Sequence, residues 1–327
     1  MRSSCSGRNR SYLRWLIESN LRRQPGFRKD FQLNERLQNL GQGLFNRNYL
    51  FEASSQLLVL RLAKVERGLR TRKEAVAHVN REAATSQSLE RLSFPYATPK
   101  FICLVREDSE EAIGLIESAV DGEQLSFCAN IYEPNRLLKI IAEIAVTVHK
   151  LPKTEFVHLQ SRFDSRAHVM EQLEDLSSSI FGQFQEAAAA RDWILSHLPE
   201  GRPSAVLHSD LLPQNVLLDE SGGGRIAIVD WQEAKLGDPA YDLAVVTRGV
   251  RKPLGVERGS ERIVDLYNQT AEHKLPSHAV RVHELIFHLN WLSDAVKKRA
   301  QKQIGGHGPE HYASLLGSIL RRAALRE

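Results

Sequence analysis

Three oxygen-bearing side chains, Asp210, Asn215 and Asp230, have types and a spacing that suit phosphate chemistry. Asn215 follows Asp210 by five residues, and Asp230 lies beyond a hairpin with the turn Ser221-Gly222-Gly223-Gly224. Transfer of a phosphoryl group needs an oriented hydroxyl, an acceptor for its proton, and positive charge on the phosphate oxygens. Mg²⁺ binds carboxylate and amide oxygens, so Asn215 and Asp230 are candidate Mg²⁺ ligands. The alternative interpretation is an Asx-rich turn with solvated side chains.

The elements that precede this segment predict a small first lobe. Apolar residues recur at helical spacing over residues 11–21, which indicates an amphipathic helix. Residues 72–92 have the composition of a second helix. Short strand patterns are punctuated by glycine, as in an antiparallel sheet. The expected strands are residues 33–40, 49–53, 56–62, 100–105 and 112–120. We expect a basic flexible tail over residues 1–10 and the first lobe over residues 11–121.

Beyond Asp121-Gly122 the pattern becomes largely helical and predicts a larger second lobe over residues 122–327. Residues 134–150 place Leu137, Ile141, Ile144 and Val148 on one stripe of a helix with proline in its first turn. Residues 165–198 are also expected to be helical. The helical half is interrupted by two predicted strands, residues 216–218 and 226–229, which form the hairpin before Asp230.

The segment around Asp210 has the spacing of a protein-kinase catalytic loop, His208-x-Asp210-x-x-x-x-Asn215, with Ser209 where protein kinases carry arginine. The kinase Asp-Phe-Gly motif appears as Asp230-Trp231-Gln232. The run Gly237-Asp238-Pro239-Ala240-Tyr241-Asp242 follows so soon that no phosphorylatable activation loop fits between them. Together these segments resemble the aminoglycoside phosphotransferases and their homoserine kinase and choline kinase relatives.

The resemblance implies a two-lobed α+β fold of the protein-kinase type, with a small antiparallel β-sheet lobe and a larger, mainly helical lobe. It implies Asp210 as the catalytic base, and Asn215 and Asp230 as ligands of Mg²⁺. It further implies that His208 is a buried support for the catalytic loop. Asp238 and Asp242 are expected to have architectural roles.

The first lobe is expected to supply the nucleotide site. The segment with Gly41, Gly43 and Asn46 is similar to the phosphate-covering loop of the family, although two glycines between strands can also form an ordinary hairpin. The run 113–122 resembles the hinge between the lobes, where backbone groups of Glu117 and Ala119 would bind adenine. The alternative for that run is an ordinary edge strand that enters a turn.

A buried ion pair is expected beside the nucleotide. Arg61, in Leu58-Val59-Leu60-Arg61, occupies the place of the lysine in the kinase run Val-Ala-Ile-Lys, and arginine keeps a fixed positive charge that suits phosphate oxygens. Lys64 is the candidate if the strand register differs. The resemblance places Glu82 on the predicted helix as the partner of Arg61, whereas a helical glutamate is more usually a solvated surface residue.

Composition and charge narrow the class of protein. With 42% hydrophobic and 26% charged residues, the chain has the composition of a soluble globular protein, and it has no apolar run of the roughly 20 residues that span a bilayer. Its three cysteines, odd in number and widely spaced, indicate a reducing cytoplasm. Residues 1–29 hold eight Arg and Lys against one acid, so an organellar transit peptide or a nucleic-acid-binding arm is an alternative to a surface helix.

We therefore expect an ATP- and Mg²⁺-dependent phosphotransferase that acts on a hydroxyl of a small molecule: a sugar, an amino alcohol, a hydroxy amino acid or an antibiotic. Residues 243–327 hold fourteen Lys and Arg against eight Asp and Glu, which argues against a polycationic aminoglycoside as the acceptor. The alternative function is a catalytically silent ATP-binding scaffold. Nucleic acid is not an expected partner. The acceptor, a choice between ATP and GTP, and the oligomeric state stay open.

Overall fold

The structure is a computed structural model, and it describes residues 7–27, 31–33, 37–42, 45–65, 71–107, 110–126, 133–159, 164–176, 178–198, 201, 203–220, 223–249, 253–302 and 306–324. The chain divides into two compact units. The first contains residues 1–123 and 216–234, and the second contains residues 124–215 and 235–327.

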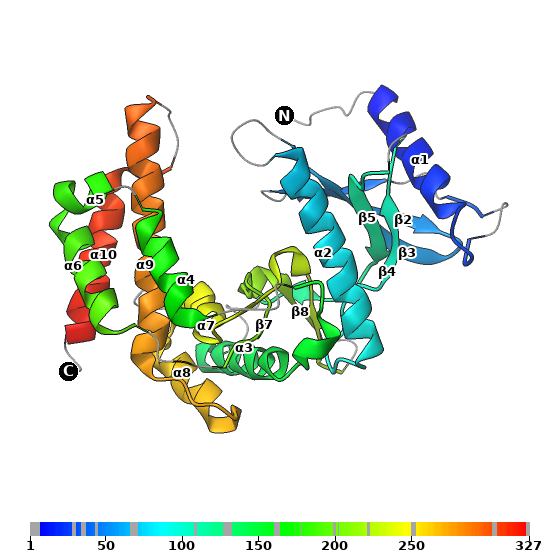
Figure 1. Cartoon of the computed structure of the whole chain (residues 1–327). Coiled ribbons are helices and arrows are strands. Elements are labelled where there is room, and N and C mark those ends of the chain that lie inside the picture. Colours follow the sequence, from blue (N-terminus) through cyan, green and yellow to red (C-terminus); the bar gives the residue numbers. More distant parts are fainter. Residues whose placement is uncertain are drawn as a thin grey trace. The chain divides into compact units, whose positions relative to one another are not determined.

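A five-stranded antiparallel sheet is the centre of the first unit (Figure 1). Its order is β1-β2-β3-β5-β4. The strands are β1 (Gln38–Gln42), β2 (Asn46–Ala53), β3 (Gln56–Ala63), β4 (Phe101–Val105) and β5 (Gly114–Ser118). Gly114 allows β3 and β5 to approach closely, because a Cβ at this position would lie 2.2 Å from the carbonyl oxygen of Arg61.

The two helices of this unit pack on opposite faces of the sheet. Leu16 and Ile17 of α1 (Gly7–Leu21) belong to one apolar cluster with Leu60 and Ile116, which are direct partners in the β3–β5 pair. Val79 of α2 (Arg72–Arg91) packs instead with Leu115. Successive side chains of a strand point to opposite faces, so Arg61, the partner of Leu115, faces α2.

A hairpin from later in the chain belongs to the first unit. Strands β8 (Val216–Asp219) and β9 (Arg225–Ile228) pair antiparallel, and Ile228 donates its N–H to the carbonyl of Ala97 at 2.8 Å. A short 3-10 helix, η4 (Trp231–Glu233), follows. The indole of Trp231 is buried, donates to the carbonyl of Ile228, and packs edge-on against Phe94. These contacts fix Asp230 between β9 and η4.

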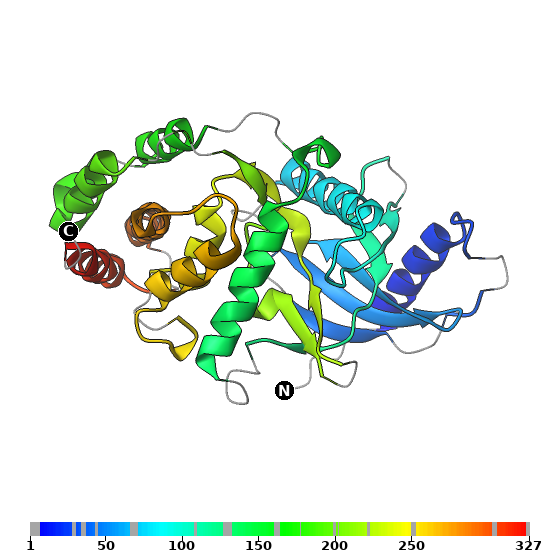
Figure 2. The same ribbon diagram turned by 90° about the horizontal axis from the view of Figure 1, so that it is seen from below.

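The second unit is mainly helical (Figures 1 and 2). Its long helix α9 (Ser277–Ala300) shares an apolar cluster with the helices α4 (Ser165–Glu174), α5 (Ser178–Gln183), α6 (Gln185–Ser196) and α10 (Pro309–Ala324). Helix α3 (Pro134–His149) packs on α8 (Gly259–Thr270), and α7 (Ala240–Thr247) packs on α9. Strands β7 (Ala205–Leu207) and β10 (Lys235–Gly237) form a short antiparallel pair, in which Lys235 lies opposite Leu207.

Most of the expected elements are present, with differences at their ends. The predicted stripe of α3 is confirmed, since Leu137, Ile141, Ile144 and Val148 are fully buried. The single helix expected over residues 165–198 is wrong: it is three helices, because the chain is extended at Phe184 and the serines at the start of α5 favour helix ends over helix interiors. Helix α1 already begins at Gly7.

Three further differences concern the strands and the units. The strand expected over residues 33–40 is reduced to a bridge at Leu33 and to β1, while residues 34–36 lie outside the described residues. The sequence placed the β8–β9 hairpin in the second lobe, whereas it packs with the first unit. The two-residue strand β6 (Glu123–Gln124) spans the point where the chain passes between the units. Among the described residues, no helix is long and apolar enough to cross a membrane.

Candidate active site

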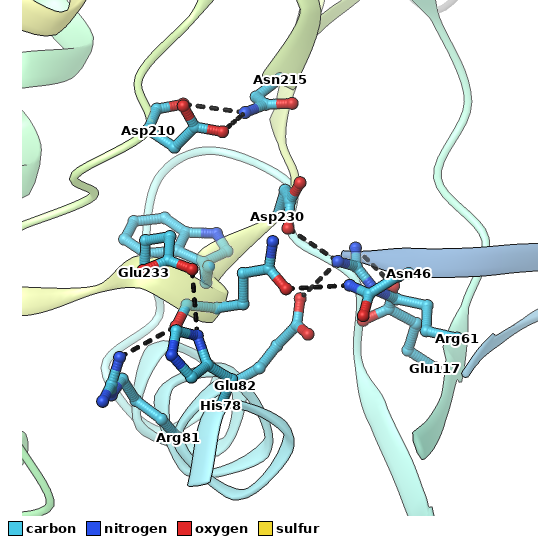
Figure 3. A network of polar contacts seen from close by, with 12 residues as sticks. Asn46, Arg61, His78, Arg81, Glu82, Glu117, Asp210, Asn215, Asp230 and Glu233 are labelled. Atoms are coloured by element: carbon cyan, nitrogen blue, oxygen red, sulfur yellow. Dashed lines mark hydrogen bonds and ion pairs between the residues drawn. The ribbon is translucent and has the colours of Figure 1, made fainter. Parts of the chain in front are cut away.

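Arg61 is the centre of a buried ionic cluster in the first unit, which we call the Arg61 cluster (Figure 3). Its guanidinium lies 2.7 Å from Asp230 Oδ1, 3.2 Å from Glu82 Oε1 and 3.7 Å from Glu117 Oε1. Glu82 comes from α2, and Glu117 comes from β5, where it stands on the same face as Leu115. The expected pair of Arg61 and Glu82 is thus present, with two further carboxylates around the same cation.

Negative charge is in excess in the Arg61 cluster, because one guanidinium faces three carboxylates. Burial by itself disfavours the cation, but Glu82, Asp230 and Glu117 outweigh it and raise the pKa of Arg61 above its usual range. Burial raises the pKa of Glu82 to about 8 and that of Glu117 to about 7, although Arg61 acts in the opposite direction on both. The two glutamates therefore hold protons readily near neutral pH.

Asp230 has an unusual backbone. Its φ of 69° and ψ of 58° place it in the left-handed region, immediately before η4. This turn directs Oδ1 to Arg61, while Oδ2 accepts no hydrogen bond from the described residues, and the side chain stays 26% exposed. A carboxylate oxygen of a partly exposed side chain, beside a buried cluster with an excess of negative charge, is suited to a hard cation such as Mg²⁺.

Contacts between α2 and the segment after Asp230 were not predicted from the sequence. His78 Nδ1 lies 3.0 Å from Glu233 Oε1, and Arg81 donates to the carbonyl of Gln232 at 3.3 Å (Figure 3). Helical spacing could have indicated them, since residues 78, 81 and 82 are three and four positions apart and share one face of α2. These contacts hold η4 against the helix that carries Glu82.

Gly41, Asn46 and Ala119, which were expected to contact the nucleotide, all belong to the first unit. Gly41 is exposed with φ 113°, at an irregularity of the β1–β2 pair, and Gly43 lies outside the described residues. Asn46 begins β2 instead of lying in a loop, and its buried amide contacts Gln232 Oε1 at 2.9 Å. The N–H of Ala119 donates to the carbonyl of Leu57 at 2.9 Å. Their roles toward a nucleotide stay predictions.

The second unit contains the candidate base. Asn215 Nδ2 donates to the backbone carbonyl of Asp210 at 2.8 Å and to Asp210 Oδ2 at 2.9 Å (Figure 3). Both bonds use the amide nitrogen, so the remaining amide oxygen, Oδ1, is directed elsewhere and accepts no hydrogen bond from the described residues. One residue thereby fixes the Asp210 carboxylate and presents an oxygen that can bind a cation.

The backbone that carries Asp210 is held by Asp242, which is fully buried in α7. Its carboxylate accepts the N–H groups of His208 at 3.0 Å and Ser209 at 2.8 Å, and it lies 3.2 Å from His149 Nε2. Ser209 has φ 65°, a conformation that costs energy for any residue with a side chain. Asp242 thus stabilises a strained turn immediately before Asp210, and we call this group the Asp242 cluster.

His208 and Asp238, the other two residues expected to support the catalytic loop, are also buried. His208 Nδ1 accepts the N–H of Asp210 at 3.2 Å. Asp238 Oδ1 accepts the N–H of Ala240 at 3.0 Å, at the start of α7, and Oδ2 lies 3.4 Å from His283 Nε2. These contacts are of the kind that architectural roles for His208, Asp238 and Asp242 require.

Comparison with known proteins gives the family. Residues 36–291 match the model of the phosphotransferase enzyme family, which is well over half of the chain and includes both clusters. The chain belongs to this phosphotransferase family. An aminoglycoside 3'-phosphotransferase from Streptomyces ribosidificus is 29% identical over 186 residues, which are 55% of this chain and 68% of the relative. The resemblance inferred from the catalytic-loop spacing is therefore confirmed.

Solved structures of aminoglycoside phosphotransferases have the same fold. A complex of aminoglycoside 2'-phosphotransferase-IIIa with GDP has a TM-score of 0.67 at 17% identity and covers 96% of this chain and 99% of its own. A ternary complex of a thermostable mutant of aminoglycoside phosphotransferase APH(4)-Ia with AMP-PNP and hygromycin B has a TM-score of 0.63 at 17% identity, covering 93% and 97%. The two-lobed α+β fold of the protein-kinase type is confirmed.

As a member of this family, the chain is a phosphotransferase that acts on a hydroxyl of a small molecule. The departures from the protein-kinase pattern fit this membership. Arg61 takes the place of the strand lysine and does contact Glu82, so Lys64 is not needed as its substitute. Ser209 takes the place of the catalytic-loop arginine, and its N–H is one of the two that Asp242 holds.

Proposed function

We propose that this phosphotransferase transfers the γ-phosphoryl group of ATP, bound with Mg²⁺, to the hydroxyl of a small neutral or anionic molecule, with Asp210 as the base. The observation that carries the proposal is the double hydrogen bond from Asn215 Nδ2 to Asp210. It holds the carboxylate at the end of a turn fixed by Asp242, where it can orient an attacking hydroxyl and accept its proton.

Two side chains fit the expected metal. Asn215 Oδ1 and Asp230 Oδ2 are oxygens without hydrogen bonds from the described residues, and amide and carboxylate oxygens are what Mg²⁺ prefers. No group of three or more His, Cys, Asp or Glu in the described part of the chain could hold a metal by itself. In this proposal the ion takes its remaining ligands from nucleotide phosphates and water. When bound, Mg²⁺ would neutralise charge on those phosphates.

Nucleotide binding is supported by the relatives and by the Arg61 cluster. The similar structures were solved with GDP, AMP-PNP and ADP. In the present chain, Arg61 orients Asp230 through a 2.7 Å bond and is itself held by Glu82 and Glu117. Arg61 thus acts by positioning the metal-binding carboxylate, and it brings a fixed positive charge to the nucleotide side of the reaction.

The charge of the acceptor is inferred from side chains near Asp210 in the second unit. Lys235 lies opposite Leu207, three residues before Asp210, and its ammonium sits 3.6 Å from the centre of the Tyr241 ring. The pKa of His168 is lowered by burial first and then by Lys235 and His283, so the imidazole is held neutral beside the fixed positive charge of Lys235. Such surroundings oppose a polycationic acceptor and suit a neutral or anionic one.

The test is ADP release from Mg-ATP by the full chain across a panel of hydroxyl compounds that differ in charge: polyols, hydroxy acids, amino alcohols and aminoglycosides. We expect a neutral or anionic class to stimulate release. Asp210→Asn should lower that rate by about a thousandfold without weakening nucleotide binding, because the base acts mainly in the transition state. Asp192→Asn, at an exposed position, is the matched control.

The acceptor charge, the role of Asp210 and the catalytic activity are each contradicted by a different result. Stimulation by aminoglycosides alone would overturn the inferred charge of the acceptor. An equal loss of turnover and nucleotide affinity in Asp210→Asn would show that Asp210 is a structural residue. Mg²⁺-independent nucleotide binding with no turnover on any compound would favour the silent scaffold.

A further inference from the structure

A cavity of about 800 Å³ lies in the helical unit. It is bounded by the end of α3, the segment that precedes β7, and the end of α8 with residues 271–275. Its volume is in the range of small-molecule binding sites. Asp210, Asn215 and Lys235 are not among the residues that line it. The cavity is therefore separate from the groups expected to perform phosphoryl transfer.

The lining combines a buried apolar floor with a basic rim. The floor includes Val146, Tyr267 and Leu275, each at most 5% exposed. Three exposed lysines, Lys150, Lys153 and Lys274, line the rim, and Glu272 is the one acid among the lining residues that the structure describes. This arrangement suits a molecule with an apolar body and an anionic group.

The ammonium groups of the rim are held by neutral oxygens. Lys150 donates to the carbonyl of Thr270 at 3.3 Å, Lys153 donates to Ser204 Oγ at 3.4 Å, and Lys274 donates to the carbonyl of Asn268. Within the described ranges, none of the three has a carboxylate partner. Their positive charge is thus available to an anion, and charge-assisted hydrogen bonds to phosphate or carboxylate are stronger than those to neutral acceptors.

A chain of hydrogen bonds connects the cavity to the catalytic loop. The Tyr267 hydroxyl lies 3.0 Å from His149 Nδ1, and His149 Nε2 lies 3.2 Å from Asp242 Oδ2. Both bonds are satisfied when the tyrosine donates to Nδ1 and the Nε2–H donates to the carboxylate. Asp242 in turn holds the backbone N–H groups of His208 and Ser209. Two of these side chains, Tyr267 and His149, line the cavity.

We propose that this cavity is an effector site for a small molecule that carries a phosphate or carboxylate group on an apolar body. Its occupancy is transmitted to Asp210 through Tyr267, His149 and Asp242. Tyr267 and His149 line the cavity, so an apolar body seated there covers the small exposed parts of both side chains, and hydrogen bonds are stronger where water is excluded. The catalytic loop is then held more firmly, so an occupied site raises kcat. Binding does not depend on the proposed reaction, whereas the effect on kcat does.

Binding is tested by calorimetric titration of the full chain with phenyl phosphate as the probe, with saturating ADP present to block the nucleotide site. The double variant Lys150→Gln/Lys274→Gln should raise the Kd of the probe by about tenfold or more, because it removes two charged donors. Lys139→Gln is the matched control, since Lys139 lies on α3, which Lys150 directly follows, is 63% exposed and does not line the cavity. Calorimetry needs no turnover, so this result is independent of the proposed function.

Transmission is tested with Tyr267→Phe, which keeps the ring and removes the hydroxyl. We expect the Kd of phenyl phosphate to stay within about twofold, while the rise of kcat, about two- to tenfold in the unsubstituted chain, disappears. Absent binding, displacement of the probe by ADP, or equal affinity in the double variant and in Lys139→Gln would overturn the site. An unchanged kcat in the occupied enzyme, or the same rise in Tyr267→Phe, would overturn the transmission.

Discussion

Each of the two units buries a polar cluster that contains at least one carboxylate, and the balance between carboxylates and their partners is opposite in the two clusters. In the Arg61 cluster, one guanidinium faces Glu82, Glu117 and Asp230. In the Asp242 cluster, one carboxylate accepts two backbone N–H groups and lies beside His149. The first has more negative charge than its cation balances, and the second has a single charge surrounded by donors. The first cluster can accept another cation, whereas the second is complete without one.

The opposite construction gives opposite pKa shifts. Burial raises the pKa of Glu82 to about 8 and that of Glu117 to about 7. Burial opposes the charged form of Asp242 as well, but the hydrogen bond from His149 and the other donors outweigh it, and its pKa is lowered. The contribution of the Arg61 cluster is therefore greatest below about pH 4.5 and is lost as pH rises to 7–8. That of Asp242 is present above its unfolded pKa and lost as pH falls below it.

Among the substitutions in the two clusters, Asp242→Asn should lower the stability of the protein most. An amide at this position can accept one N–H, but its own NH₂ group then faces a donor, so a buried donor loses its partner. We expect the free energy of unfolding, from urea denaturation at pH 7.5, to fall by about 3 kcal/mol, with a loss of kcat as the turn at Ser209 relaxes.

Asp265→Asn, at an exposed position of α8, is the matched control for Asp242→Asn. If Asp242→Asn had the same free energy of unfolding as Asp265→Asn, the Asp242 cluster would not be a rigid support of the catalytic loop.

The difference between the clusters also shows what the sequence can predict. The Arg61–Glu82 pair was expected because Arg61 stands in a strand at the place of the kinase lysine and the family resemblance puts Glu82 on the next helix, and both positions are marked by local motifs. The sequence did not predict that the Glu117 side chain belongs to the Arg61 cluster. That contact depends on the strand register, which places Val59 opposite Glu117 and directs residues 61 and 117 to one face of the sheet.

Other features depend on packing between distant segments. Strands β7 and β10 have three residues each, too few to show an alternating pattern, so the position of Lys235 opposite Leu207 could not be read from the sequence. The bond from Tyr267 to His149 joins residues 118 positions apart. No local pattern encodes such a contact. A base and metal ligands could be predicted from the sequence because the spacing of Asp210, Asn215 and Asp230 is short and their chemistry is specific.

Arg61→Met should have a smaller effect than Asp242→Asn, although it removes the only cation of the Arg61 cluster. Glu82 and Glu117 already hold protons readily and can become neutral at little cost once the arginine is absent. We expect a loss of about 2 kcal/mol at pH 8 and less at pH 5, measured by urea denaturation at both values.

Two further variants calibrate Arg61→Met. Arg61→Lys keeps the charge and should lose less, and Arg72→Met, at an exposed ion pair with Glu111, is the control. A loss for Arg61→Met that is as large at pH 5 as at pH 8 would contradict the protonation of the glutamates.

Glu117→Gln should have the smallest effect, and it tests the charge excess directly. Glutamine keeps the shape of the side chain but cannot ionise, so it removes one of the two raised pKa values. In the unsubstituted chain, the folded state binds more protons than the unfolded state between about pH 4.5 and 7, so stability falls as pH rises through this window. The variant should reduce this fall by roughly 1 kcal/mol, while Glu90→Gln, at an exposed position of α2, should leave it unchanged. If Glu117→Gln instead left the pH dependence intact or made it steeper, burial would not raise the pKa of Glu117 in the folded state, and the carboxylate would be ionised at neutral pH beside Arg61.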